Sequence, residues 1–148
     1  MTGSHLQQVL ETLQYVYHET DTWLEITTLL IPGLNDSDKE LHQLSEWIVE
    51  NLGPNVPLHF SAFSPQYKLQ SIPATSLESV LKAREIAMSK GLFYVYCGNI
   101  HHPESASTWC SHCGHLLIER NAYQLGEINI DEQANCKQCG QKCPGIFS

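Results

Sequence analysis

The stretch Trp23-Leu-Glu-Ile-Thr-Thr-Leu-Leu-Ile31 is followed directly by Pro32-Gly33. Its β-branched and apolar residues are typical of a strand that is buried over most of its surface, and a Pro-Gly pair commonly ends such a strand. A buried strand needs other elements to cover it. The residues on either side of this stretch therefore decide the class of the fold.

Helical patterns flank the strand on both sides. Before it, Ser4 can cap a helix whose apolar residues recur every three or four positions, at Leu6, Val9, Leu10, Leu13, Val16 and Tyr17. After it, Ser37-x-x-Glu40 forms a capping box. Apolar residues then follow at helical spacing up to a Gly-Pro stop, at Leu41, Leu44, Ile48 and Leu52. The sequence predicts helix, strand and helix in succession.

The same unit then repeats along the chain. Residues 56–63 predict a second strand, and residues 64–74 predict a long loop. Thr75-x-x-Glu78 is a second capping box that opens a helix, and residues 92–97 predict a third strand. Alternating helices and strands with short joins predict parallel strands, so the fold class is α/β.

Three parallel strands with helices on one face would leave the other face and both edges without partners. Parallel sheets are normally covered on both faces, and a closed barrel needs about eight such units. The sequence supplies roughly half of a barrel. We therefore expect the exposed sheet to associate with a second copy of the chain or with another polypeptide.

Two CxxC knuckles lie in the C-terminal region, Cys110-Ser-His-Cys113-Gly and Cys136-Lys-Gln-Cys139-Gly. Two residues between cysteines let both sulfurs of a tight turn reach one ion, and the glycine that follows permits the backbone turn. Four such thiolates predict a structural, tetrahedral zinc site. The spacing leaves open iron in the same cage, and a pair of disulfides.

Other potential ligands near the knuckles are expected to play no part in the site. The run Cys136-x2-Cys139-x3-Cys143 resembles the end of a ferredoxin cluster motif, but one cysteine of the usual four is missing, so Cys143 is predicted to be a small buried residue. The four cysteines already complete a shell, so nearby histidines are predicted to be exposed, namely His101, His102, His112 and His115. The predicted units are residues 1–104, half of a barrel, and residues 105–148, a zinc-ribbon-like domain.

Charge and hydropathy exclude two classes of partner. The net charge is −8, with 8 basic against 16 acidic residues, which argues against nucleic acid because phosphate binding depends on Lys and Arg. No apolar run approaches the roughly 20 residues of a membrane span, and Met1 is followed by no basic and apolar leader. The sequence predicts a cytoplasmic protein without membrane or nucleic-acid partners.

Four motifs in order carry a resemblance to a known family. They are Thr28-Leu-Leu-Ile-Pro-Gly-Leu-Asn-Asp36, Pro57-Leu-His-Phe-Ser-Ala-Phe-Ser-Pro-Gln-Tyr-Lys68, Gly91-Leu-Phe-Tyr-Val-Tyr-Cys-Gly-Asn99 and the CxxCG pair. Together they resemble the C-terminal part of the AmmeMemoRadiSam-system radical SAM proteins, which are relatives of pyruvate formate-lyase activating enzymes. The resemblance implies the C-terminal half of a partial (βα)6 radical SAM barrel followed by a cysteine-rich tail.

The resemblance also implies cofactors for the full-length family, S-adenosylmethionine and a 4Fe–4S cluster. In that family a CxxxCxxC loop holds the cluster, and this sequence contains no CxxxCxxC. We expect a C-terminal fragment that contributes part of the cofactor and substrate cleft, that needs an N-terminal radical SAM half, and that generates no radical alone. The zinc-ribbon tail could position a protein substrate, while the substrate of the parent enzyme stays open. The alternative is a noncatalytic zinc-ribbon module for protein interaction.

The resemblance further implies which residues face the cofactor. Ile31-Pro-Gly33-Leu-Asn-Asp36 is similar to an I-x-G-x-x-E-like element that lies near the adenine of S-adenosylmethionine in radical SAM barrels. Ile31, Gly33 and Asp36 are therefore candidate cofactor residues. A plain turn from strand to helix, capped by Asp36 or Ser37, explains the same stretch.

Alternation along the second predicted strand gives two more candidates. If Leu58, Phe60 and Ala62 face the helices, then His59, Ser61 and Phe63 point into the barrel, since successive side chains of a strand point to opposite faces. His59 and Ser61 are thus predicted to lie near cofactor or substrate. A strand with one mixed polar face is the alternative.

Overall fold

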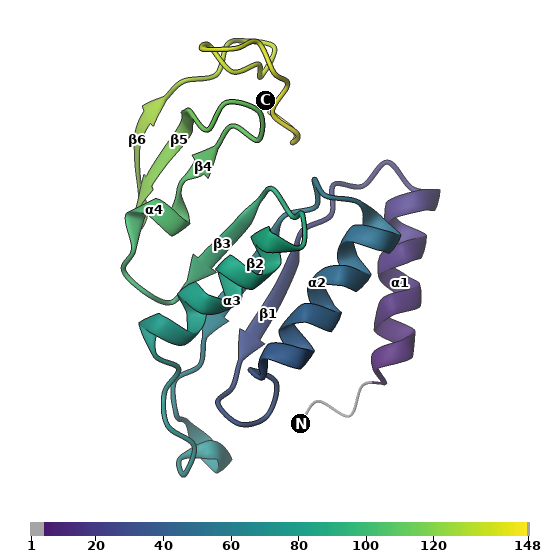
Figure 1. Ribbon diagram of the computed structural model, residues 1–148, viewed down its shortest axis with the longest axis vertical. Coiled ribbons are helices and arrows are strands. Elements are labelled where there is room, and N and C mark those ends of the chain that lie inside the picture. The colour runs from purple at the N-terminus through teal and green to yellow at the C-terminus, as the bar shows by residue number, and fades with distance from the viewer. Residues whose placement is uncertain (1–4, 148) are drawn as a thin grey trace.

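The computed structural model describes residues 5–147, so the predicted cap Ser4 lies outside the described residues. The chain forms two three-stranded sheets (Figure 1). The first is parallel with strand order β1-β2-β3, and the second, nearer the C-terminus, has strand order β4-β5-β6. The α/β class and the parallel sheet agree with the sequence prediction.

The parallel sheet is built from short strands. They are β1 (Ile26–Leu30), β2 (Leu58–Ala62) and β3 (Val95–Gly98). The third strand was predicted from residue 92, but it begins at Val95. The Phe93 N–H instead donates to the Pro54 carbonyl, and Leu92 is buried in the core, so these residues belong to the turn that enters the strand.

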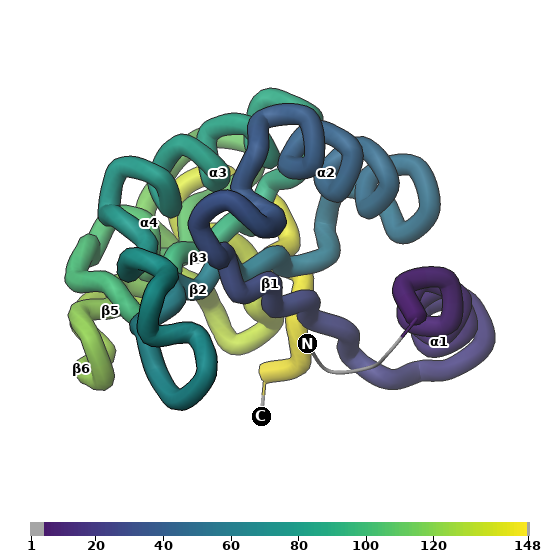
Figure 2. The backbone as a smooth tube through the Cα atoms, turned by 90° about the horizontal axis from the view of Figure 1, so that it is seen from below, coloured from purple at the N-terminus to yellow at the C-terminus, as the bar shows by residue number. Residues whose placement is uncertain are grey.

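Two helices cover one face of this sheet, α2 (Asp38–Leu52) and α3 (Leu77–Ser89) (Figures 1 and 2). The core between helices and strands consists of large aliphatic and aromatic side chains with almost no exposed surface, among them Leu30, Ile48, Leu52, Leu58, Phe60 and Val80. Burying such side chains supplies about 1.5–3 kcal/mol each relative to exposure. A short 3-10 helix, Tyr67–Leu69, interrupts the loop before α3.

The two predicted capping boxes have different outcomes. Ser37 caps α2 as predicted, and its side chain accepts a hydrogen bond from the Glu40 N–H. The second prediction was wrong, because Ser76 caps α3 and accepts from the Ser79 N–H. Thr75 is buried instead: its hydroxyl donates to the Leu30 carbonyl at 2.6 Å and accepts from the Phe63 N–H at 3.0 Å. Thr75 thereby joins the ends of β1 and β2.

Helix α1 (Leu6–Glu19) stands apart from the sheet (Figure 2). It has no buried residue, and the Leu6 side chain is 72% exposed. Its polar contacts with α2 run through Asn51, whose side chain accepts from Gln14 and whose carbonyl bonds to His18. The apolar stripe predicted from the sequence is present, but within residues 5–147 little covers it.

The C-terminal region forms the antiparallel sheet. After the short helix α4 (Pro103–Ala106) come β4 (Thr108–Trp109), β5 (Leu116–Asn121) and β6 (Gln124–Ile128). We call residues 108–147 the ribbon. Its buried core is small and consists of Cys110, Leu117, Cys136 and Cys143. Every residue of β6 is exposed.

The second face of the parallel sheet is open at one side and covered at the other. Along β1 the residues that point away from α2, Thr27 and Leu29, are exposed, as predicted for an uncovered face. At β3 the prediction was wrong, because the ribbon lies against this strand and Tyr96 Oη shares a hydrogen bond with Thr108. The uncovered part of the sheet is therefore its β1 side.

Among the described residues, none of the helices is both long and apolar enough to cross a lipid bilayer.

Candidate functional site

The four knuckle cysteines converge in the ribbon. Their Sγ atoms all lie within 4.8 Å of one another, a grouping that could hold a metal ion. Cys110 Sγ lies 3.6 Å from Cys139 Sγ, and Cys113 Sγ lies 3.8 Å from Cys136 Sγ. An ion bound at about 2.3 Å by four tetrahedral sulfurs separates them by roughly 3.8 Å. The spacing of the sulfurs thus fits a tetrahedral ion, and none of these cysteines is joined in a disulfide.

Both knuckles have the same backbone geometry. In the first, the Cys110 N–H donates to the His115 carbonyl, and the Gly114 N–H donates back to the Cys110 carbonyl. In the second, Cys136 and Gly140 make the equivalent pair of bonds. Gly114 and Gly140 adopt φ of +69° and +77°, where a side chain would be strained. This requirement explains the glycine after each pair of cysteines.

The electrostatics of the sulfurs also favour a bound cation. Burial opposes ionisation of the Cys110 thiol, but backbone N–H groups of Cys113 and His112 prevail and lower its pKa to about 7. For Cys139, the Gln141 backbone favours the thiolate, but desolvation and the neighbouring thiols raise its pKa to about 12. The Cys139 thiol thus resists ionising beside Cys110. A divalent cation at the centre of the four sulfurs would relieve the repulsion between thiolates.

The neighbouring candidates behave largely as predicted. Cys143 is buried at 3% exposure beside Cys110 and Cys136, outside the group of four sulfurs. His101 and His112 are exposed. The prediction was wrong for His102 and His115, which are half-buried. His102 caps α4 by accepting from the Ser105 N–H. The ferredoxin-like use of Cys143 gains no support.

A cavity of about 630 Å³ lies between the second face of the parallel sheet and the ribbon. Its size suits a small organic ligand, since ligand pockets span roughly 300–1,000 Å³. Aromatic side chains contribute much of its wall, namely Trp23, His59, Tyr94, Tyr96 and Phe147. Residues 144–147 also line it. Residues of β2, β3 and the ribbon line this cavity together with Thr27 of β1.

A chain of hydrogen bonds crosses the sheet side of the cavity. Glu25 Oε2 lies 2.8 Å from His59 Nε2, and Glu25 Oε1 accepts from the Trp23 indole at 2.9 Å. The His59 ring stacks on Tyr96 with centroids 5.0 Å apart. Burial opposes ionisation of Glu25, but the bonds from Trp23 and His59 prevail and hold its pKa below 4.5. Glu25 is therefore a carboxylate at neutral pH.

The ribbon supplies the opposite wall. Arg120 Nη1 donates to Thr108 Oγ1 at 2.6 Å and to the Ala106 carbonyl at 3.4 Å. Its guanidinium lies over the Tyr96 ring, 5.9 Å from the centroid. Burial raises the pKa of Tyr96, so its phenol stays protonated and holds the 2.9 Å bond with Thr108. This network fixes Arg120 at the edge of the cavity.

The predicted cofactor residues divide into two groups. His59 and Ser61 line the cavity, as the alternation along β2 predicted, but Phe63 lies beyond the strand, is buried and does not line it. Ile31, Gly33 and Asp36 also lie outside the cavity, in a hydrogen-bonded turn. There the Asp36 carboxylate accepts from the Gly33 N–H at 2.8 Å, and Asn35 accepts from the Ile31 N–H. The turn between strand and helix accounts for these local contacts.

Sequence reasoning missed Glu25, Tyr96 and Arg120. For Tyr96, the signal was its position relative to His59. Tyr96 on β3 lies opposite His59 on β2, and His59 lies opposite Thr27 on β1, so a residue that shares the register of His59 was a candidate for the same site. Glu25 lies two positions before Thr27, so the alternation of side chains along β1 places the two on the same side. Arg120 carried no such signal, since its place depends on how the ribbon docks.

Three comparisons place the chain among known proteins. No protein-family model matches it. It is 41% identical over 138 residues to an uncharacterized protein of Methanocaldococcus jannaschii, a match that covers 93% of this chain and 41% of that protein. The chain thus spans about two fifths of the length of the curated relative it matches.

The fold resembles part of a solved structure, a radical SAM methyltransferase from Sphaerobacter thermophilus. The TM-score is 0.51 at 18% sequence identity, and the superposed region covers 75% of this chain and 30% of that chain. At this identity the likeness concerns the fold.

Proposed function

We propose that this chain is the C-terminal portion of a radical SAM protein of the AmmeMemoRadiSam type, related to pyruvate formate-lyase activating enzymes. In this proposal residues 1–104 form half of a partial (βα)6 barrel, and residues 105–148 form a zinc-ribbon-like domain. The observation that carries the proposal is the likeness of the fold to part of a radical SAM methyltransferase.

The open side of the sheet supports this proposal. β1 is an edge strand, its free face carries the exposed residues Thr27 and Leu29, and α1 has no buried residue beside it. An exposed edge strand of this kind invites pairing with another strand. The partner in this proposal is an N-terminal radical SAM half, and self-association through the same surface is the outcome when that half is missing.

The cavity supports a role in the substrate cleft. His59 and Ser61 would face the substrate or S-adenosylmethionine, while Ile31, Gly33 and Asp36 lie at the carboxyl end of β1, where α/β folds bind ligands. A cluster-bound S-adenosylmethionine supplies radical chemistry in such enzymes, but this sequence has no CxxxCxxC to hold the cluster. This chain alone is therefore proposed to be inactive.

The four cysteines would hold zinc in a structural role. Four sulfurs complete a tetrahedral shell and leave no open position for a substrate. The metal would join two knuckles whose buried apolar core is otherwise small. The ribbon in turn holds Arg120 over the cavity and would help to position a protein substrate.

A noncatalytic interaction module is the second candidate. The observation that favours it is the exposed hairpin of β5 and β6, where Tyr123 is fully exposed and Leu125 and Ile128 are 65% and 50% exposed. In this case the ribbon, and not the cavity, would contact the partner.

Cleavage of S-adenosylmethionine separates the two candidates. The chain and the full-length Methanocaldococcus jannaschii relative would each be reconstituted anaerobically with iron and sulfide, and 5′-deoxyadenosine would be measured after reduction with dithionite. We expect the full-length relative to form it and the chain to form none.

Metal analysis of the chain completes the experiment. One zinc per chain without acid-labile sulfide is expected. A full-length relative that binds a cluster but never cleaves S-adenosylmethionine would favour the interaction module, and 5′-deoxyadenosine formed by the chain alone would refute the proposal of an incomplete enzyme.

A further inference from the structure

The strongest unassigned feature is Arg120. It is the one Arg or Lys side chain that lines the cavity among residues 5–147. Its side-chain hydrogen bonds within that range use Nη1 only, with Thr108 and Ala106 as acceptors. The Nε and Nη2 donors of Arg120 are left for another partner. The guanidinium donors form a planar fork whose geometry matches a carboxylate or a phosphate.

We propose that the cavity binds a small anionic molecule with a planar body, and that Arg120 anchors its carboxylate or phosphate group. The surrounding wall fits this chemistry. Trp23, Tyr94 and Tyr96 offer aromatic surface for a flat apolar body, and the hydroxyls of Thr27 and Ser61 offer polar contacts on the sheet side.

The charges around the cavity favour an anion over a cation. The carboxylate of Glu25 is already engaged at both oxygens, by the Trp23 indole and by His59. Arg120 has no carboxylate partner within hydrogen-bonding distance among the described residues, because the three ion pairs there involve His59, Lys82 and Lys90. Glu25 attracts Arg120 at longer range but makes no hydrogen bond to it among the described residues, so the Nε and Nη2 donors of Arg120 stay available to an anion.

The rigidity of Arg120 makes it suitable as an anchor. Thr108 Oγ1 and the Ala106 carbonyl fix Nη1, while the Tyr96 ring lies beneath the guanidinium at 5.9 Å. A side chain held in this way loses little conformational entropy on binding. Identifying the anion as the substrate of the parent enzyme rests on the proposed function, whereas the binding site itself does not.

Three probes that share a benzene ring test the inference on the metal-loaded chain. Benzoate is anionic, benzamide is neutral with nearly the same shape, and benzylammonium is cationic. Titrations followed by nuclear magnetic resonance of the Trp23 indole and the Arg120 guanidinium would report binding in the cavity. We expect the dissociation constant of benzoate to be about tenfold or more below that of benzamide. A charge-assisted hydrogen bond strengthens binding by roughly this factor.

Variants locate the anchor. Arg120→Gln should weaken benzoate about tenfold or more and leave benzamide unchanged. Lys68→Gln is the control, because Lys68 is an exposed cation that lies outside both the cavity and the cysteine knuckles. Arg120→Lys keeps the charge without the fork and should give intermediate binding, which preserves the test if Arg120→Gln does not fold.

Phenyl phosphate, compared with benzoate, distinguishes the two kinds of anion. Tighter binding of either one assigns the ligand class and supports the site. Equal binding of benzoate and benzamide, preference for benzylammonium, unchanged binding by Arg120→Gln, or no saturable binding would each overturn the inference. None of these results depends on S-adenosylmethionine cleavage, so a failure here leaves the proposed function standing, and the reverse also holds.

Discussion

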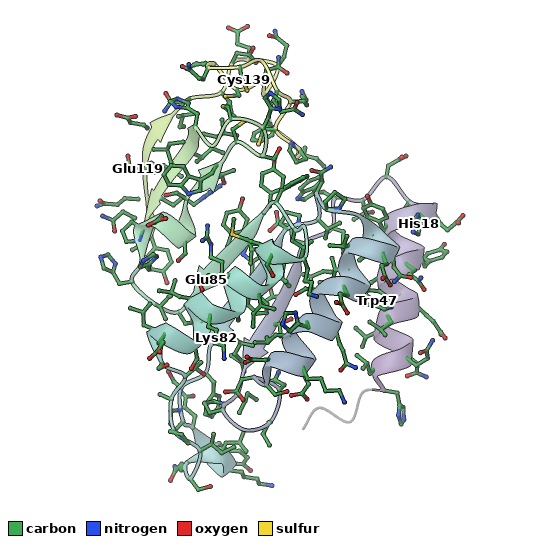
Figure 3. The ribbon with its side chains drawn as sticks, viewed as in Figure 1. His18, Trp47, Lys82, Glu85, Glu119 and Cys139 are labelled. Atoms are coloured by element: carbon green, nitrogen blue, oxygen red, sulfur yellow. The ribbon has the colours of Figure 1, made fainter. Side chains whose placement is uncertain are left out.

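The parallel sheet and the ribbon are stabilised by different means. Leu30 and Phe60 of the sheet and Ile48 of α2 have no exposed surface and belong to one continuous core between the sheet and its two helices. In the ribbon, the buried core is Leu117 with three cysteines. The sheet thus depends on apolar area removed from water, whereas the ribbon brings together four sulfurs that could hold a metal ion. In Figure 3 the label Glu85 marks α3, which covers the parallel sheet, and the label Cys139 marks the ribbon.

This difference teaches that each region should respond to its own perturbation. A change in the core should destabilise the sheet and leave metal binding intact, and a change of ligand should do the reverse. The two regions meet through Tyr96, Thr108 and Arg120, so effects transmitted between them should be small compared with effects inside each.

The largest effect is expected from loss of a sulfur ligand. Cys136→Ser should abolish metal binding and disorder the ribbon, because a structural zinc site contributes about 10 kcal/mol or more to folding. Zinc content and hydrogen exchange of β5 would measure this. Cys97→Ala is the control, since Cys97 is buried in the sheet core. One retained zinc per chain in Cys136→Ser would contradict the assignment of Cys136 as a metal ligand.

A cavity in the sheet core should have the next largest effect. Phe60→Ala removes a fully buried ring and should lower the free energy of unfolding by about 3–5 kcal/mol while the zinc content stays unchanged. Chemical denaturation would measure the loss. Leu29→Ala, on the open face of β1 where Leu29 is 43% exposed, should cost far less. Similar losses from both variants would refute the assignment of the two faces.

Removal of the Thr75 hydroxyl should have an intermediate effect. Thr75→Val leaves the Leu30 carbonyl and the Phe63 N–H without their partner and should cost about 2 kcal/mol. The comparison is Thr12→Val, because Thr12 bonds to the Gln8 carbonyl on an exposed helix surface and should change stability by about 0.5 kcal/mol or less. Thermal unfolding of both variants decides the matter; equal effects would argue against a structural role for Thr75.

The smallest effect concerns pH. Because the folded pKa of Glu25 lies below the ordinary 4.5, its carboxylate stabilises the fold above about pH 4.5. That contribution is lost as pH falls through the folded pKa. The difference in unfolding free energy between the wild type and Glu25→Gln should therefore shrink on acidification. A carbon-13 titration of Glu25 in His59→Gln should show a higher pKa, and an unchanged value would exclude the His59 bond as a cause.

Local patterns predicted much of this fold because each rests on neighbouring residues. The period of apolar positions gave α2 and α3, and the alternation of Leu58, Phe60 and Ala62 gave the buried face of β2. The capping box at Ser37 was right. At Thr75 the same pattern failed, because the hydroxyl bonds two strand ends and the next serine takes over the cap.

By itself, the sequence determined the α/β class, the parallel order of strands and the four cysteines that converge, since helical period, capping and CxxC spacing are local constraints. Only the tertiary structure decided that the ribbon covers the β3 side of the sheet and carries Arg120 to the cavity beside Tyr96. Arg120 and Tyr96 meet because the ribbon packs against the parallel sheet, and no local pattern encodes the place where two surfaces distant in sequence come together.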